Sequence, residues 1–333
     1  MYNILFVQRS PCIRNYKQAV ALKNSGIKVT LAYTKYSLEK MYGISSISVY
    51  DQVVVFRNAD QLKDLSYNFD VVHCHNSPDI YTLWALKGTA PVIHDTHDLV
   101  SLVNSSKIVS DLEREIYASV HGKVFVSQTM LNVVRDLYDI SLDNSIVLYN
   151  YPTQCDIPEE RLPKLSQGTN TVHLVYEGTL GFVRHRRFMR QLDTIASIDR
   201  YIHIYSRNKV EINNPYIIKH GHVNPKSLLL ELSQYDYGLV PFIVNDKTRL
   251  NINTSMPNKL FEYLAVGVPV LVCPGTEMST FVEREQVGYT VTKAADYDTS
   301  IQLPRPFVSK VYLMEDQIQI LLSLYRNLLK DTY

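Results

Sequence analysis

The chain has 333 residues, of which 46% are apolar, and it carries 34 Lys and Arg against 33 Asp and Glu. This length predicts about two domains, and the apolar content suffices for full hydrophobic cores. The balanced charge excludes a global field that would attract nucleic acid or an acidic partner, so any anion has to be bound by local groups.

Apolar runs also limit where the protein can reside. No run approaches the roughly 18 residues of a membrane span, and the opening MYNILFV has no basic leader, so a cytoplasmic protein is expected. The four cysteines are far apart and form no Cys-x-x-Cys pair; they are Cys12, Cys74, Cys155 and Cys273. They are predicted to be reduced core residues, with no disulfide or zinc framework.

Short apolar strands alternate with helix-compatible segments in the first half of the chain. A strand at residues 4–7, a helix at 16–23 and a strand at 28–33 form a right-handed crossover unit. Further strands are predicted at residues 52–56, 70–74, 90–94, 123–127 and 146–149. This pattern predicts a doubly wound parallel sheet that binds ligands beyond the carboxyl ends of its strands. Polar residues follow three of these strands, at residues 8–10, 73–77 and 94–98.

The second half repeats this alternation. Residues 153–171 lose periodicity and gather Pro, Glu, Gln and Gly, which indicates a linker. Strands are then predicted at residues 172–176, 201–205, 217–219, 237–240 and 268–273, with helices between them. Residues 312–329 have the apolar spacing of a long helix.

Residues 255–269, SMPNKLFEYLAVGVP, predict a polar loop, a short helix and a buried strand. Asn258 and Lys259 stand at the helix start, where free N–H groups and the helix dipole favour an anion. Glu262, one turn further on, does not favour the same phosphate and is better explained as an acceptor for sugar hydroxyls. Phosphate and hydroxyl together indicate a nucleotide.

Several motifs resemble one known family. PNKLFEYLAVGVPVLV, YDYGLVPF and LVYEGTLGFVRH occur in the second half, and VIHDTHDL, VFVSQTM and IVLYNYP in the first. They resemble GT-B glycosyltransferases of the large retaining group, family four. The resemblance implies two Rossmann-like doubly wound domains that face a central cleft: residues 1–155 bind the acceptor and residues 166–305 bind a nucleotide sugar. It also implies that the helix in residues 312–333 crosses back to the N-terminal domain, and that neither a metal nor a cofactor is needed.

The resemblance also assigns donor-binding residues. Glu262 matches the acid that accepts the ribose hydroxyls, and Asn258 and Lys259 lie where the diphosphate or the sugar would be, although Lys259 also fits a surface lysine. Many members carry a second glutamate eight residues before the first, where this chain has Thr254. The Thr254 hydroxyl cannot supply a negative charge, so the contact to the donor sugar is altered at Thr254 or comes from Ser255, Asn253 or Asp246.

A second phosphate contact is expected after the strand at residues 172–176. There Gly178 and Thr179 form a turn that lets the backbone approach a ligand, and Arg184 follows as a cation for the diphosphate. Arg186 and Arg187 compete for this role, and a solvated basic run is the structural alternative.

His97 matches a family histidine beside the transferred sugar, and either Asp95 or Asp98 is expected to orient its ring or to cap the next helix. On the acceptor side Ser10, Asn76 and Asp98 are expected, although Gln8, Arg9 and Ser10 replace the family's glycine pair. The histidines at 73, 75, 94 and 97 lack the helical spacing of zinc enzymes, so no metal site is predicted.

The predicted function is a retaining, metal-independent transfer of a sugar from a nucleoside diphosphate sugar to a glycan, lipid-linked or other glycoconjugate acceptor, as in polysaccharide biosynthesis. The alternatives are a catalytically silent homologue that binds a partner, and a nucleotide-sugar epimerase. A contact with the inner face of the membrane stays open, because a basic face could form from Lys17, Lys23, Lys28, Lys35 and Lys40.

Overall fold

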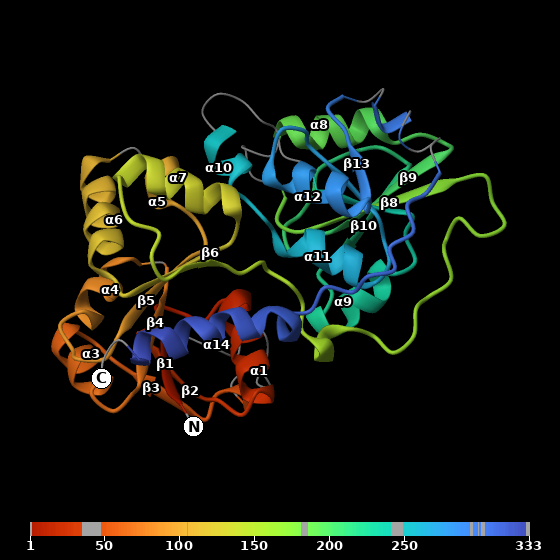
Figure 1. Ribbon diagram of the computed structural model, residues 1–333. Coiled ribbons are helices and arrows are strands. Elements are labelled where there is room, and N and C mark those ends of the chain that lie inside the picture. The colour runs from red at the N-terminus through yellow and green to blue at the C-terminus, as the bar shows by residue number, and fades with distance from the viewer. Residues whose placement is uncertain are drawn as a thin grey trace. The chain divides into compact units, whose positions relative to one another are not determined.

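The computed structural model describes residues 2–34, 48–76, 78–104, 106–180, 186–240, 249–293, 296–298, 300 and 304–330. Two compact units divide the chain: Met1–Thr153 with Leu313–Tyr333 form unit 1, and Gln154–Tyr312 form unit 2. Each unit is built on one parallel β-sheet with helices packed against it (Figure 1). The α/β fold predicted from the alternating apolar runs is confirmed.

Unit 1 holds a seven-stranded sheet in the order β3-β2-β1-β4-β5-β6-β7, and its described strand pairs are parallel. The strands are β1 (Asn3–Gln8), β2 (Lys28–Tyr33), β3 (Gln52–Val55), β4 (Val71–His75), β5 (Val92–Thr96), β6 (Gly122–Phe125) and β7 (Ser145–Val147). The winding direction reverses between β1 and β4. Sheets of this kind bind ligands at such a switch, outside the carboxyl ends of the strands.

Helices cover both faces of this sheet. They are α1 (Ile13–Asn24), α3 (Ala59–Ser66), α4 (Ile80–Ala85), α5 (Val100–Val103), α6 (Lys107–Ser119), α7 (Gln128–Tyr138) and α14 (Met314–Lys330). In β1, Ile4 and Phe6 join a core with α1 and α14, while Leu5 and Val7 join a core with α3, α4 and α6. Alternate side chains point to opposite faces, so a strand covered on both sides has to be apolar throughout.

α14 belongs to unit 1 although it follows unit 2 in the sequence. It runs beside α1 (Figure 1) and buries Ile318, Leu321 and Tyr325 in the core. Gln317 fixes it to the segment after β7: its Nε2 donates to the carbonyl of Tyr149 at 2.7 Å, and its Oε1 accepts from the Tyr149 N–H at 3.0 Å. The predicted return of the C-terminal helix to the N-terminal domain is confirmed.

Unit 2 holds a six-stranded parallel sheet in the order β10-β9-β8-β11-β12-β13. Its strands are β8 (Val172–Glu177), β9 (Arg200–Tyr205), β10 (Ile217–Gly221), β11 (Tyr237–Val240), β12 (Val270–Val272) and β13 (Gly288–Thr290). Its helices are α8 (Arg186–Ile195), α9 (Pro225–Leu232), α10 (Arg249–Asn253), α11 (Asn258–Ala265), α12 (Glu277–Glu285) and the short 3₁₀-helix η2 (Gln154–Asp156). The switch point of this sheet lies between β8 and β11.

The segment 153–171 forms no helix or strand besides η2, as its composition predicts. Part of it is nevertheless docked on the loop before β11. The Leu165 N–H donates to the Gln234 carbonyl at 2.9 Å, and Lys164 Nζ donates to the carbonyls of Ser233 and Tyr235 at 2.9 and 2.5 Å. Burial lowers the pKa of Lys164 to about 8. Together with the Leu162 N–H, which donates to the Ser233 hydroxyl, these contacts attach residues 162–166, the docked strip, to unit 2.

Two expectations about single residues need correction. Cys74 and Cys273 are free and buried, as predicted, but Cys12 is only half-buried and Cys155 is exposed, so these two are not core residues. Lys17 is 2% exposed and cannot contribute to a basic face, while Lys35 and Lys40 lie outside the described residues. Within the described part of the chain, no helix has both the length and the apolarity to span a bilayer.

Candidate functional site

The loop after β8 meets the start of α11 in unit 2. Lys259 Nζ lies 2.5 Å from the carbonyl oxygen of Glu177 and 4.0 Å from the centre of the Tyr176 ring. Gly178 has a φ of +127°, which residues with a side chain rarely adopt, and a Cβ there would lie 2.7 Å from Lys259 Nζ. Glycine therefore leaves the space that the ammonium group occupies at the carboxyl end of β8.

Tyr263 holds α11 across the switch point. Its hydroxyl oxygen accepts from the Glu177 N–H at 2.8 Å, next to the end of β8. Its ring covers β11 at Gly238, where a Cβ would lie only 2.2 Å from the ring. The helix is thus tied to both central strands, and its first residues come to the place where ligands bind in sheets of this type.

The other predicted donor residues lie around the start of α11. Asn258 is its first residue and is half-buried, and Glu262, one turn on, is 9% exposed. Thr254 is fully buried, and its hydroxyl donates to the Asn251 carbonyl at 2.9 Å; the Ser255 hydroxyl donates to the same oxygen at 2.7 Å. A sugar contact from either hydroxyl stays a prediction and requires it to be released from, or shared with, α10.

A cavity of about 170 Å³ opens beside this cluster. It lies at the carboxyl ends of β8, β9 and β10, and its lining includes Gly178, Thr179, Tyr205, Ser206 and His222. The Ser206 hydroxyl oxygen accepts from the Leu180 N–H at 3.2 Å, which fixes the turn after β8. The predicted residues Gly178, Thr179 and Lys259 are therefore brought together at one edge of the sheet.

The predicted cations after this turn are only partly described. Arg184 lies outside the described residues, as does Asp246. Arg186 and Arg187 begin α8 and are exposed. Which of the three arginines contacts a diphosphate therefore stays a prediction.

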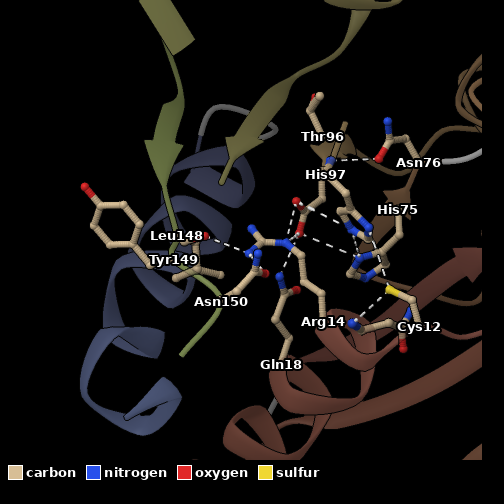
Figure 2. A network of polar contacts seen from close by, with 12 residues as sticks. Cys12, Arg14, Gln18, His75, Asn76, Thr96, His97, Leu148, Tyr149 and Asn150 are labelled. Carbon is tan, nitrogen blue, oxygen red and sulfur yellow. Dashed lines mark hydrogen bonds and ion pairs between the residues drawn. The ribbon is translucent and has the colours of Figure 1, made fainter. Parts of the chain in front are cut away.

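A second polar cluster surrounds Asp95 at the end of β5 in unit 1. Figure 2 labels Arg14, Gln18 and His97 of this cluster. Arg14 Nε donates to both carboxylate oxygens at 3.0 and 3.1 Å, and Gln18 Nε2 donates to one of them at 2.7 Å. Arg14 also donates to the Leu148 carbonyl at 2.7 Å and to Asn150 Oδ1 at 3.0 Å. Burial would raise the pKa of Asp95, but the Arg14 charge and further hydrogen bonds hold it well below its usual value. The pair ties α1 to β5 and to the segment after β7.

His97 follows β5 directly and is part of the same cluster (Figure 2). Its Nδ1 lies 3.7 Å from Cys12 Sγ, and its Nε2 lies 3.2 Å from His75 Nδ1 and 3.9 Å from Asp95 Oδ1. Burial would lower the pKa of His97, but Cys12 and Asp95 outweigh it and raise this pKa. Of the two predicted partners, Asp95 is the one beside the ring, because the Asp98 side chain is exposed.

Asn76 fixes the backbone around His97. Its Oδ1 accepts from the His97 N–H at 2.7 Å, and its Nδ2 donates to the Asp98 carbonyl at 2.6 Å. The predicted acceptor-side residues Asn76 and Asp98 are thus adjacent to His97, with the Asp98 carboxylate facing solvent. Ser10 is half-buried in the turn after β1, and its contact with an acceptor stays a prediction.

Among the described residues, one group of three potential metal ligands has its ligand atoms within 4.8 Å of one another: His73, His75 and Asp95. Arg14 already pairs with this carboxylate at 3.0 Å, and His73 Nδ1 lies 2.7 Å from the Tyr325 hydroxyl. A guanidinium on the same carboxylate repels a divalent cation. The donor set therefore fits a buried ion pair better than a metal ion.

Sequence reasoning missed several residues of these clusters. Arg14 and Cys12 stand at the start of a helix whose pattern shows only that it is partly apolar. Asp79 is 6% exposed, and its Oδ1 has no hydrogen-bond partner. Burial, with a smaller effect of Glu113, raises the pKa of Asp79 to about 7. Tyr263 carried a signal, because a tyrosine among the buried positions of a helix needs a partner for its hydroxyl.

Two family profiles match the chain in succession. The profile of Glycosyltransferase Family 4 matches residues 16–151 and includes His97. The profile of the Glucosyltransferase 3-like C-terminal domain matches residues 174–304 and includes Lys259. A search of curated proteins by sequence returned no significant match.

Solved structures match nearly the whole chain. Sucrose-phosphate synthase from Thermosynechococcus elongatus gives a TM-score of 0.73 at 12% identity, over 99% of this chain and 100% of that one. HepE of Anabaena in complex with UDP and glucose gives 0.68 at 11% identity, over 99% of both chains. A putative UDP-N-acetylglucosamine 2-epimerase from Listeria monocytogenes gives 0.61 at 10% identity, over 100% of this chain and 98% of that one.

At such low identities, likeness to solved structures establishes the fold alone. That fold is the GT-B fold, in which one chain forms two α/β units, each with its own sheet of parallel strands. The two profiles add the family, since they describe glycosyltransferase domains and match the two halves in order. The chain is therefore a family four-like glycosyltransferase with the GT-B fold.

Proposed function

We propose that the protein transfers a sugar from a nucleoside diphosphate sugar to a hydroxyl of a glycan, lipid-linked or other glycoconjugate acceptor, with retention of anomeric configuration and without a metal ion. The observation that carries this proposal is the contact of Lys259 with Gly178 and the carbonyl of Glu177 at the carboxyl end of β8. A cation beside a glycine turn and a helix start suits a diphosphate.

A uridine diphosphate sugar is the first donor to test. HepE of Anabaena was solved with UDP and with UDP-glucose, which supports this choice of base. The cavity beside Gly178 and Thr179 would hold the nucleoside, and the Glu262 carboxylate would accept the ribose hydroxyls. Lys259 would leave the Glu177 carbonyl and bind the diphosphate.

The proposed chemistry needs positive charge rather than a base. In a retaining transfer the leaving phosphate takes the acceptor's proton on the face from which it departs. Lys259, with Arg184 or a neighbouring arginine, would stabilise the charge that develops on this phosphate. His97 and Asn76 in unit 1 would contact the transferred sugar and the acceptor, together with Asp98 and Ser10.

Donor binding tests the proposal through Glu262. Isothermal titration with UDP-glucose should give a dissociation constant that Glu262→Gln raises by about tenfold or more, because a charge-assisted hydrogen bond to a ribose hydroxyl is lost. Glu283→Gln makes the same change on the exposed face of α12 and should leave the affinity unaltered. Equal affinity of the wild type and Glu262→Gln for UDP-glucose would show that Glu262 does not bind the donor.

The fold also accommodates an epimerase, as the Listeria match illustrates. This alternative is weaker, because both family profiles describe glycosyltransferases. A silent homologue is the other alternative, and Thr254 in place of a glutamate favours it. Incubating UDP-glucose without acceptor separates the three. A transferase releases UDP slowly, an epimerase changes the sugar but keeps it on UDP, and a silent homologue does neither.

A further inference from the structure

Cys12 and His97 bring a thiol and an imidazole together at the carboxyl edge of the sheet in unit 1. Cys12 is the N-cap of α1, and its Sγ accepts from the Asn15 N–H at 3.5 Å. On its other side Sγ faces His97 Nδ1 at 3.7 Å (Figure 2). A helix N-terminus and a neighbouring imidazolium both favour a thiolate in proteins.

The hydrogen bonds of the ring fit a fully protonated His97. If Nδ1–H donates to Cys12 Sγ, then Nε2–H can donate to His75 Nδ1 at 3.2 Å. Asp95 Oδ1, 3.9 Å from Nε2, adds a negative charge on that side. Each nitrogen of a protonated ring thus has an acceptor.

The remaining groups around the pair do not cancel this preference. The titratable and charged groups that face it are Arg14 from α1, His73 and His75 from β4, Asp79 before α4, and His94 and Asp95 from β5. Arg14 offsets part of the Asp95 charge, and the remainder still favours the imidazolium. Burial lowers the pKa values of the three other histidines, so they stay neutral. Asp79, with a pKa of about 7, adds negative charge as it ionises, which also favours the imidazolium. None of these groups therefore reverses the transfer of the proton from the thiol to the ring.

We propose that Cys12 is a positioning residue that holds His97 as an imidazolium through a thiolate–imidazolium pair. The proton leaves Sγ and binds Nδ1, so the pair stays neutral overall. Burial opposes ionisation of Cys12, but His97 outweighs it and the pKa falls to about 7. Only the consequence for transfer rests on the proposed function: His97 presents a cation, not a neutral ring, to the substrate.

The same thiolate makes Cys12 a site of covalent modification by alkylating electrophiles. With iodoacetamide the sulfur attacks the methylene carbon, a sulfur–carbon bond forms and iodide leaves. The reaction rate follows the thiolate fraction, so its pH profile reports the thiol pKa directly. Replacing the exposed Cys155 by Ser and quantifying the Cys12 peptide by mass spectrometry isolates this site, since Cys74 and Cys273 are buried.

Between about pH 5 and 10, alkylation of Cys12 should rise with a midpoint near 7, well below the value of about 8.5 for an ordinary thiol. His97→Gln should move the midpoint upward by about one unit or more. His121→Gln is the control. His121 precedes β6 and accepts a hydrogen bond from the Val92 N–H at the amino ends of the strands, away from Cys12, so its substitution should leave the midpoint unchanged. A wild-type midpoint at or above about 8.5, or one that His97→Gln does not move, overturns the pair. The wild-type profile needs no variant to fold.

The role in transfer is read separately. Cys12→Ser cannot supply an anion at neutral pH, so the His97 pKa should fall and the alkaline limb of the pH profile of kcat should move to lower pH. A purely structural role would lower kcat equally at every pH. If Cys12 titrates as expected but no nucleotide sugar binds, the proposed function fails and the ion pair stands. If a donor binds but Cys12 titrates as an ordinary thiol, the reverse holds.

Discussion

Gly178 and Lys259 come from different sequence motifs, but the position of the Lys259 side chain requires a residue without a side chain at position 178. The glycine has a φ of +127°, and the space of its missing side chain is occupied by the lysine ammonium group. The sequence motifs predict both residues in a donor site, but only the fold shows that the lysine rests on the Glu177 carbonyl. A side-chain contact between two segments of the chain leaves no periodic pattern, so no local rule could predict it.

Substitution of Gly178 by Ala should damage this donor site. The new methyl group would lie 2.7 Å from Lys259 Nζ, so the lysine has to move, and the dissociation constant for UDP-glucose should rise by about tenfold. Gly275→Ala is the matched control, since Gly275 has a φ of +70° but open space around its Cβ position. Both variants should lose about 1 kcal/mol of stability through backbone strain. If both bind the donor equally well, the clash has no role in binding.

The raised pKa of Asp79 should make the free energy of unfolding depend on pH. Its folded-state pKa of about 7 exceeds the value of about 3.9 for an ordinary aspartate, so the folded protein binds the extra proton. This contribution is fully present below about pH 4 and is lost as the pH rises through 7. Asp79→Asn should therefore be more stable than wild type at about pH 8, by 1 to about 4 kcal/mol, and the gain should shrink near pH 5. Urea unfolding at both pH values checks this, and a gain independent of pH would contradict it.

At the scale of elements, three neighbouring strands of unit 2 carry a row of histidines. His173 in β8 bonds His203 in β9 at 2.9 Å, and His203 bonds His220 in β10 at 2.9 Å. The strands themselves follow from their apolar runs, but the row depends on register, which aligns His173 beside Tyr201 and His203 beside Ile218. The sequence does not predict β13, because its three half-buried residues form too short a pattern to recognise.

This row should weaken unit 2 in acid. Burial lowers the pKa of His203 to about 3, below the value of about 6.5 in the unfolded chain. Its neutral form is therefore favoured by folding, and the stability it contributes is lost as the pH falls below about 6.5. At about pH 5 the loss from this one group approaches 2 kcal/mol. His203→Gln should show a smaller drop in unfolding free energy between pH 7.5 and 5 than wild type; an equal drop would show that His203 does not titrate on unfolding.

At the scale of the whole molecule, the chain is two doubly wound units, and the alternation of apolar runs was enough to predict both. The return of α14 to unit 1 followed from the family resemblance, and the burial of Ile318, Leu321 and Tyr325 accounts for it physically. The docked strip at residues 162–166 could not be foreseen, because the Lys164 ammonium group that holds it binds carbonyls about 70 residues further along the chain, and such a distant contact leaves no local pattern. The same holds for Arg14 and Asp95, whose pairing is visible only once α1 packs beside β5.

We propose that this GT-B chain breaks the bond between sugar and diphosphate with retention. The most direct measurement is proton NMR of UDP-glucose incubated with the enzyme and water as the acceptor, recorded before the released sugar mutarotates. We expect α-glucose and UDP to appear first, and we expect Lys259→Met to slow their release at least about tenfold while Lys293→Met, on the surface of unit 2, does not. Initial release of β-glucose, or a changed sugar still attached to UDP, would contradict it.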